Sequence, residues 1–182
     1  MKVKNNEFYK KLFALVLPIT VQNLMTALVS ASDALMLGFL NQSALSAVSL
    51  ATQVQFVLNL FYAALTIGTT VLAAQYWGKG DKKTVERILG LAERISLIIS
   101  LVFFVISFTM PTTIMKIFTS SPDTIAAGSE YLRVISFSFM FMGFSQIFMS
   151  ALRSIGKIML PSVTYVVSLC VNVLCNASFI LG

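Results

Sequence analysis

The chain has 182 residues, of which 57% are hydrophobic and only 11% are charged. Soluble globular chains carry about 25% charged residues, so this chain lacks the charge that a water-facing surface requires. Its formal net charge of +6 does not indicate nucleic-acid binding, because the basic residues lie at the ends of apolar runs rather than along one stripe. The length allows about five membrane-spanning helices at roughly 20 apolar residues each.

The residue types that carry most enzyme chemistry are missing. The chain has no histidine, which is the commonest general base and a frequent metal ligand. Cys170 and Cys175 are five residues apart on one expected helix, so they point to different faces and form neither a disulfide nor a metal pair. The segment Gly78-Lys79-Gly80 lacks the spacing of a phosphate-binding loop. We therefore expect no enzyme, no cofactor and no structural metal centre.

The hydrophobic pattern predicts an all-α integral membrane protein. Each expected helix is long enough to cross the roughly 30 Å hydrocarbon core at 1.5 Å per residue. The expected helices cover about residues 11–40, 44–77, 82–110, 122–152 and 158–182.

Polar and glycine-containing segments separate these helices. Residues 41–43 read as a short polar turn and residues 78–81 as a tight glycine turn. Ser121 is expected to be an N-cap, with Pro122 at the first helical position. Before it, apolar residues within 114–118 predict a short amphipathic piece that lies on the membrane surface.

The basic residues predict the orientation of the chain in the membrane. If five helices alternate, ten lysines and arginines share one side, and the other side has Lys116 and little else. Positive charge is retained in the cytoplasm, so we expect a multi-pass plasma-membrane protein with a cytoplasmic N-terminus. Glu93 and Arg94 are expected to mark the cytoplasmic interface as a structural pair. The ten basic residues of the cytoplasmic side are Lys2, Lys4, Lys10, Lys11, Lys79, Lys82, Lys83, Arg87, Arg153 and Lys157.

One acid lies inside the first expected helix. A carboxylate in a membrane helix costs roughly 3 kcal/mol on insertion scales, which makes Asp33 a candidate for function. Gln22, Thr26, Ser30 and Asp33 follow at spacings of four, four and three residues, so they share one helix face. This face should line a bundle interior or a watery cavity. The alternative is that Asp33 only reaches the outer interface or caps a turn.

Two further helices carry polar faces, which together with the first imply a shared central cavity. The alternative is that these side chains form interhelical hydrogen bonds that hold the bundle together. Met140 is a further cavity candidate because methionine adapts to varied apolar shapes, although plain packing explains it as well. The faces consist of Tyr165, Ser168, Asn172 and Asn176 in 158–182, and of Gln55, Asn59, Tyr62 and Thr66 in 44–77.

Several motifs, in order along the whole chain, resemble the N-terminal part of the multidrug and toxic compound extrusion (MATE) transporters. Each motif alone is weak, but their order and spacing together are specific. They are Leu17-Pro18-Ile19 with Gln22-Asn23, Asp33-Ala34-Leu35-Met36-Leu37-Gly38, Ala44-Leu45-Ser46-Ala47-Val48, Ala74-Gln75-Tyr76-Trp77-Gly78-Lys79-Gly80-Asp81, Ala151-Leu152-Arg153-Ser154-Ile155-Gly156, and Asn172 with Phe179-Ile180-Leu181-Gly182.

The resemblance implies a secondary antiporter of about twelve helices in two six-helix lobes. Such proteins expel organic cations and other amphipathic drugs in exchange for sodium or protons. It also implies that Asp33 is the cation-coupling carboxylate, and that sodium, where it is the coupling ion, binds there. Asn172 matches an asparagine of that site, whereas Asn176 stands where one branch of the family has an acid.

The resemblance covers an incomplete N-terminal lobe, residues 1–182, without the sixth helix and the second lobe. Alternating access needs two units that move against each other, so we expect this chain alone to transport nothing and to require the missing C-terminal half. Two other functions stay open at this point. One is a lipid or oligosaccharide-lipid flippase of related architecture, which would have a more cationic cavity. The other is a non-transporting membrane fragment.

Overall fold

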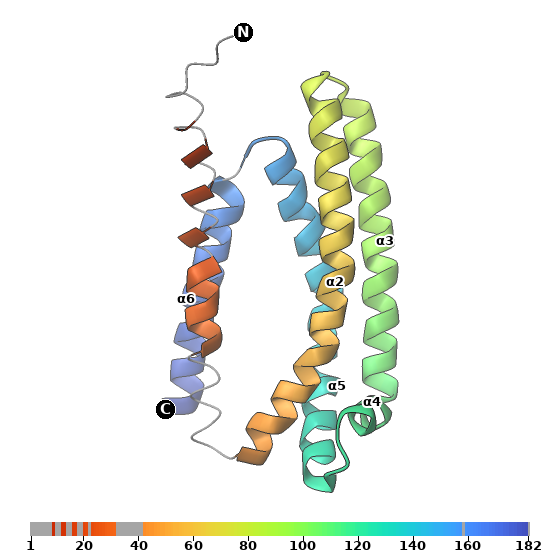
Figure 1. Cartoon of the computed structure of the whole chain (residues 1–182), viewed down its shortest axis with the longest axis vertical. Coiled ribbons are helices and arrows are strands. Elements are labelled where there is room, and N and C mark those ends of the chain that lie inside the picture. Colours follow the sequence, from red (N-terminus) through yellow and green to blue (C-terminus); the bar gives the residue numbers. More distant parts are fainter. Residues whose placement is uncertain are drawn as a thin grey trace. The chain divides into compact units, whose positions relative to one another are not determined.

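A computed structural model describes residues 9, 12, 13, 16, 17, 20, 21, 23–31, 42–157 and 159–181, without the side chains of residues 42–44, 176, 177 and 179–181. In this part of the chain every regular element is an α-helix, as the hydrophobic pattern predicts (Figure 1). The labelled helices are α2 (Gln42–Gly78), α3 (Lys82–Thr109), α4 (Pro111–Phe118), α5 (Pro122–Ser154) and α6 (Met159–Leu181).

The chain divides into two compact units. One comprises Leu37–Gly156, with α2 to α5, and the other comprises Met1–Met36 together with Lys157–Gly182, which includes α6. In the first unit α2, α3 and α5 run side by side, and α4 lies across one end of them (Figure 1). In the second unit the described residues between 9 and 31 are helical.

Three helices are long and apolar enough to cross a membrane. Within the described residues these spans are Leu45–Gly78 with 34 residues, Lys82–Thr109 with 28 and Pro122–Ser154 with 33. Helix α6 contributes a shorter apolar stretch, Met159–Cys175. The span of 34 residues exceeds the roughly 20 that the hydrocarbon core requires, so it must tilt or project into the interface. The first of the five expected spans lies partly outside the described residues.

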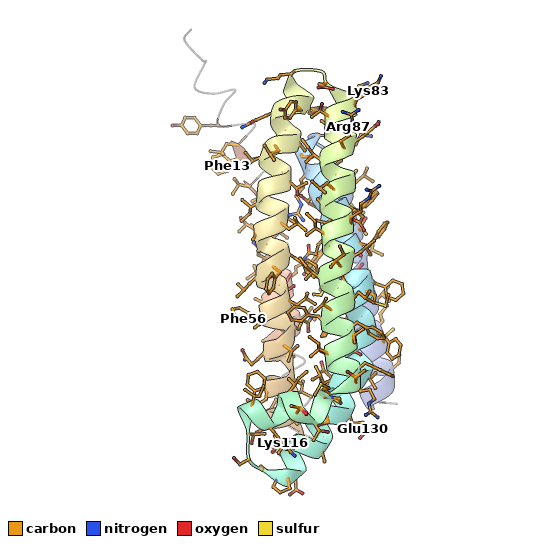
Figure 2. All side chains as sticks on the ribbon, turned by 90° about the vertical axis from the view of Figure 1, so that its right-hand side faces the viewer. Phe13, Phe56, Lys83, Arg87, Lys116 and Glu130 are labelled. Atoms are coloured by element: carbon orange, nitrogen blue, oxygen red, sulfur yellow. The ribbon has the colours of Figure 1, made fainter. Side chains whose placement is uncertain are left out.

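The first unit is built around a small apolar core on the facing sides of α2, α3 and α5. Leu58 and Tyr62 of α2 meet Leu132 and Phe139 of α5 there, and all four side chains are buried. The outer faces are also apolar: Ile98 and Phe141, for example, are 63% and 75% exposed. Figure 2 shows such side chains projecting all along the helices. An apolar exterior of this extent is what a lipid-facing surface requires.

Gly143 of α5 allows the three helices to approach closely. A Cβ atom at this position would collide with the hydroxyl groups of Ser96 and Ser100 on α3 and would lie 3.0 Å from the hydroxyl of Tyr62 on α2. Small residues are the usual means by which membrane helices come together, because no hydrophobic effect drives helix association within lipid. Gly143 therefore determines how tightly the polar groups of this bundle pack.

The predicted glycine turn between α2 and α3 is present, and its geometry explains its sequence. Gly80 has φ of +78°, which glycine adopts without a Cβ penalty. The amide of Asp81 donates to the carbonyl of Tyr76 at 3.1 Å, and the amide of Gly80 donates to that of Trp77 at 3.0 Å. This pair of bonds is the Schellman arrangement. Asp81 is then the N-cap of α3, because its carboxylate accepts from the amide of Thr84 at 3.1 Å.

The short segment predicted within 114–118 is present as α4, and it inserts Met115, which is fully buried, against Gly128 of α5. One local prediction needs correction. Gln42 and Ser43 belong to the first turn of α2 rather than to a connecting turn. Ser121 is the N-cap of α5 with proline following it, as expected, but its side chain makes no capping hydrogen bond.

Replacing Gly143 with alanine is expected to destabilise the first unit by about 1–3 kcal/mol, the usual cost of overpacking a tight interior. Gly68→Ala is the matched control, because a Cβ there meets nothing within 4 Å. The measurement is the free energy of unfolding of each variant by denaturant titration in detergent micelles. Equal stability of the two variants would contradict the close approach at Gly143.

Protection of the Thr84 amide from hydrogen exchange is expected to depend on the charge of Asp81. Hydrogen bonds from the side chain and amide of Thr84 hold the pKa of Asp81 below its ordinary value of 3.8. The stabilisation of the first turn of α3 by the Asp81 carboxylate is therefore complete above pH 3.8. It is lost as the pH falls through the lower pKa that Asp81 has in the folded state. In Asp81→Asn, which caps without a charge, protection should not change over this range. A parallel loss in both proteins would disprove the role of the carboxylate.

Candidate functional site

In the second unit, the polar faces of the N-terminal helix and α6 meet. The hydroxyl of Thr26 lies 2.9 Å from the hydroxyl of Tyr165, and both side chains are half-buried. The two residues are 139 positions apart in the chain, so the bond reflects tertiary packing rather than local geometry. It joins one member of each of the two polar faces that the sequence pattern predicts.

The other predicted residues of this unit follow along the same helices. Ser168 is one turn beyond Tyr165 and donates to the carbonyl of Thr164 at 2.9 Å, so its hydroxyl is satisfied within α6. Asn172, one turn further, is exposed, and Ser30 of the N-terminal helix is exposed as well. Asn176 continues the face of α6, but its side chain is not among those described.

Two predicted site residues lie outside the described residues, namely Gln22 and Asp33.

The first unit holds Tyr62 in its interior. This tyrosine is 1% exposed, and its hydroxyl lies 2.6 Å from that of Ser100, which donates onward to the carbonyl of Ser96 at 2.8 Å. Tyr62 OH also lies 3.4 Å from the carbonyl oxygen of Phe139. These bonds join α2 to α3 and α5, so Tyr62 forms the interhelical contacts that were the alternative interpretation of this face.

The remaining candidates of the first unit are less enclosed. Gln55 and Asn59 are half-buried at the edge of the packed face of α2, and Met140 on α5 is 40% exposed. A half-exposed amide or thioether offers both polar and apolar contact. These side chains can therefore line an amphipathic surface, which the fully buried Tyr62 does not.

Sequence reasoning missed a second polar contact between α2 and α5. The hydroxyls of Thr70 and Ser150 lie 2.6 Å apart, and Ser150 also lies 3.4 Å from the carbonyl oxygen of Thr66. The serines of α3 were missed too, although Ser96, Ser100 and Ser107 recur at spacings of four and seven. That spacing, which places them on one helix face, was the signal available in the sequence.

Glu93 does not form the expected pair with Arg94. One carboxylate oxygen of Glu93, Oε1, is buried and has no hydrogen-bond partner among the described residues, whereas Arg94 is exposed. Adjacent residues on a helix point about 100° apart, so one points inward and the other outward. The ion-pair prediction for this position is therefore wrong.

Comparison with known proteins gives a consistent result. The MatE family model matches residues 18–177. Over 97% of its length the chain is 25% identical to a probable multidrug resistance protein NorM of Thermotoga maritima. Over 79% of its length it is 23% identical to a probable multidrug resistance protein YoeA of Bacillus subtilis. The matched parts cover only 38% and 31% of those two relatives.

The Thr26–Tyr165 bond is expected to stabilise the packing of the N-terminal helix on α6 by about 0.6 kcal/mol, the average for such bonds in membrane bundles. The test is a double-mutant cycle of Thr26→Val and Tyr165→Phe, read as free energies of unfolding in detergent. A coupling energy indistinguishable from zero would show that the two hydroxyls do not interact.

Proposed function

This chain belongs to the MatE family of membrane transporters, which are not enzymes, and we propose that its parent protein is a secondary active antiporter. In this proposal, the protein exports organic cations or other amphipathic drugs in exchange for sodium or protons. The relatives named as probable multidrug resistance proteins support the substrate class. The protein lies in the plasma membrane with its N-terminus in the cytoplasm, an orientation that the distribution of basic residues supports.

The chain itself corresponds to only part of the proposed transporter. It spans less than two fifths of the length of the curated relatives that it matches. Alternating access requires two units that rock around a central binding site. The transport activity therefore belongs to the complete protein, in which this chain supplies most of an N-terminal lobe and a C-terminal half completes the substrate path.

The observation that carries the proposal is the hydrogen bond between Thr26 and Tyr165. It supports the view that the polar faces of the N-terminal helix and α6 are turned toward each other. Asp33 follows Thr26 on the first of these faces by helical spacing, and Asn172 follows Tyr165 on the second. In this proposal the two faces bring Asp33 and Asn172 together, where the carboxylate and the amide would supply oxygen ligands for sodium, or the carboxylate would accept a proton.

The proposed coupling step is the neutralisation of Asp33. A bound sodium ion or a proton removes its negative charge, and a neutral side chain packs differently in an apolar surround than a charged one. Asn172 and Asn176 assist by supplying uncharged ligands on α6. The resulting change in helix packing would release a cationic drug, for which Gln22, Ser30 and Ser168 are the candidate contact residues of this unit. Gln55, Asn59 and Met140 remain candidates in the first unit.

A lipid or oligosaccharide-lipid flippase is the main rival. Such a protein needs positive charge where the anionic headgroup passes. In the described residues, the predicted polar faces of the N-terminal helix, α2 and α6 carry hydroxyl and amide side chains and no lysine or arginine. This composition favours an uncharged or cationic substrate over an anionic one.

Asp33→Asn in the complete gene product is expected to abolish ion-driven efflux, because asparagine cannot gain or lose the charge that couples ion and drug. The measurement is efflux of a fluorescent organic cation from membrane vesicles, with sodium and proton gradients imposed separately. The gradient that drives efflux in the unmodified protein identifies the coupling ion.

Asp123→Asn is the matched control, since Asp123 is an exposed acid in the first turn of α5, away from the predicted polar faces. It should leave efflux unchanged. Efflux that persists in Asp33→Asn would place the coupling site elsewhere. Absence of efflux from the unmodified protein under either gradient would favour the flippase or a non-transporting protein.

A further inference from the structure

An open groove of about 620 Å³ follows the outer face of α3 next to the α2–α3 turn. Figure 2 shows Lys83 and Arg87 at this end of the bundle, with Lys116 and Glu130 at the other end. The groove is lined by Lys83, Glu86, Arg87, Gly90, Leu91 and Arg94.

The charge of this groove is strongly positive for so short a segment. Three cations face a single acid, Glu86. Lys83, Arg87 and Arg94 lie four and seven residues apart, so they form one stripe along the helix. No salt bridge within 4.0 Å neutralises these cations in the part of the chain that the structure describes. Arg87 interacts electrostatically with the carboxylate of Asp81 at the start of α3, but the three cations still outnumber Asp81 and Glu86, so the stripe attracts anions.

Gly90 leaves the helix backbone without a covering side chain in the middle of the stripe. A Cβ at this position would meet nothing within 4 Å, so the helix backbone is bare between Arg87 and Arg94. The two arginines are about 10 Å apart along the helix axis at 1.5 Å per residue. Their long side chains can converge on a single phosphate over the glycine, and a guanidinium binds phosphate through two parallel hydrogen bonds.

The same face of α3 becomes apolar directly beyond Arg94. Ile98, Leu101 and Val105 continue the stripe at spacings of four, three and four residues, and all three are exposed. They lie inside a candidate membrane span, Lys82–Thr109. Cations followed by an apolar strip on one helix face match the two parts of a phospholipid, a charged headgroup and an acyl chain.

Aromatic residues mark the level of the membrane surface at this end. Lys79 lies over the ring of Tyr76 at 5.3 Å, and Lys82 lies over the ring of Trp77 at 5.9 Å. Tyrosine and tryptophan are enriched where the headgroups meet the hydrocarbon. The groove starts within a few residues of Trp77 and ends at Arg94, next to the exposed apolar residues of the span, so its Arg94 end adjoins the hydrocarbon.

We propose that this groove binds an anionic phospholipid, with its headgroup phosphate on Arg87 and Arg94 and an acyl chain along Ile98, Leu101 and Val105. A zwitterionic lipid fits less well, because its own cation opposes the stripe. A soluble acidic peptide would use the cations but not the apolar strip that continues from them. The site is independent of the proposed transport activity, and it would anchor the α2–α3 end of the bundle in its leaflet.

Trp77 is the only tryptophan of the chain, so a variant with Trp77→Phe and Leu101→Trp carries a single tryptophan on the apolar strip, where it reports contact with a bound acyl chain. This reporter chain is reconstituted in phosphatidylcholine vesicles that contain a small fraction of dibrominated lipid, either phosphatidylglycerol or phosphatidylcholine. Bromine quenches tryptophan fluorescence on contact, so the two quenching curves give the relative affinity of the two lipids. We expect a preference for phosphatidylglycerol of about 25-fold, since Arg87 and Arg94 each contribute about fivefold.

Arg87→Gln with Arg94→Gln should reduce this preference to about twofold or less. The matched control is Lys116→Gln with Arg133→Gln, which removes the same charge from α4 and α5 and should preserve the preference. Glu86→Gln removes the one acid of the groove and should increase the preference. Circular dichroism of each variant verifies that the helices are intact.

Three outcomes would overturn the proposal. An unchanged preference in the Arg87 and Arg94 variant would exclude the groove. Equal losses in both double variants, or a preference that vanishes in about 1 M salt, would reduce the effect to diffuse net charge. Absence of any lipid preference, together with binding of a soluble polyglutamate peptide that Arg87→Gln with Arg94→Gln abolishes, would assign the groove to acidic peptides.

Discussion

Hydrocarbon offers no hydrogen-bond partner, so a hydroxyl inside a membrane bundle is stabilised when it bonds to its own helix or to a neighbour. The chain from Tyr62 through Ser100 to the carbonyl of Ser96 provides such bonds between α2 and α3, whereas the hydroxyls of Ser96 and Ser107 have no partner among the described residues. Gly143 of α5 leaves the space that these groups occupy. The packing of three long helices thus depends on one missing side chain and on the Tyr62–Ser100 bond beside it.

Polar side chains in this protein therefore serve two distinct purposes. Those that are buried and bonded between helices, such as Tyr62 and the Thr70–Ser150 pair, hold the first unit together. Those described on the N-terminal helix and α6, such as Thr26, Ser30 and Asn172, are half-buried or exposed, and they are the residues on which the proposed ion site rests. Burial separates the two groups, although the residue types and helical spacing are the same.

The two ends of the first unit differ in chemistry as well. The end at the α2–α3 turn has the basic groove of α3. It also has two cation–π contacts, in which Lys79 lies over the ring of Tyr76 and Lys82 over the ring of Trp77. The opposite end has Lys116 on α4 and Arg133, which lies 6.0 Å from the ring centre of Phe108. A bundle with such a charge difference has a preferred orientation in a membrane, and the proposed lipid site would add a specific contact to this general preference.

Hydrophobic runs, glycine turns and basic clusters are local properties, so the sequence by itself determined the helical class, the bounds of α3 and α6 to within one or two residues, and the Gly80 turn. It also determined the family, because the motifs lie in order along the chain. Tertiary structure alone decided that Met115 inserts beside Gly128, that Tyr62 is buried in the bundle, and that one carboxylate oxygen of Glu93 is buried. Helical spacing places residues on a common face, but only the packing of neighbouring helices decides whether that face meets another helix, lipid or a cavity.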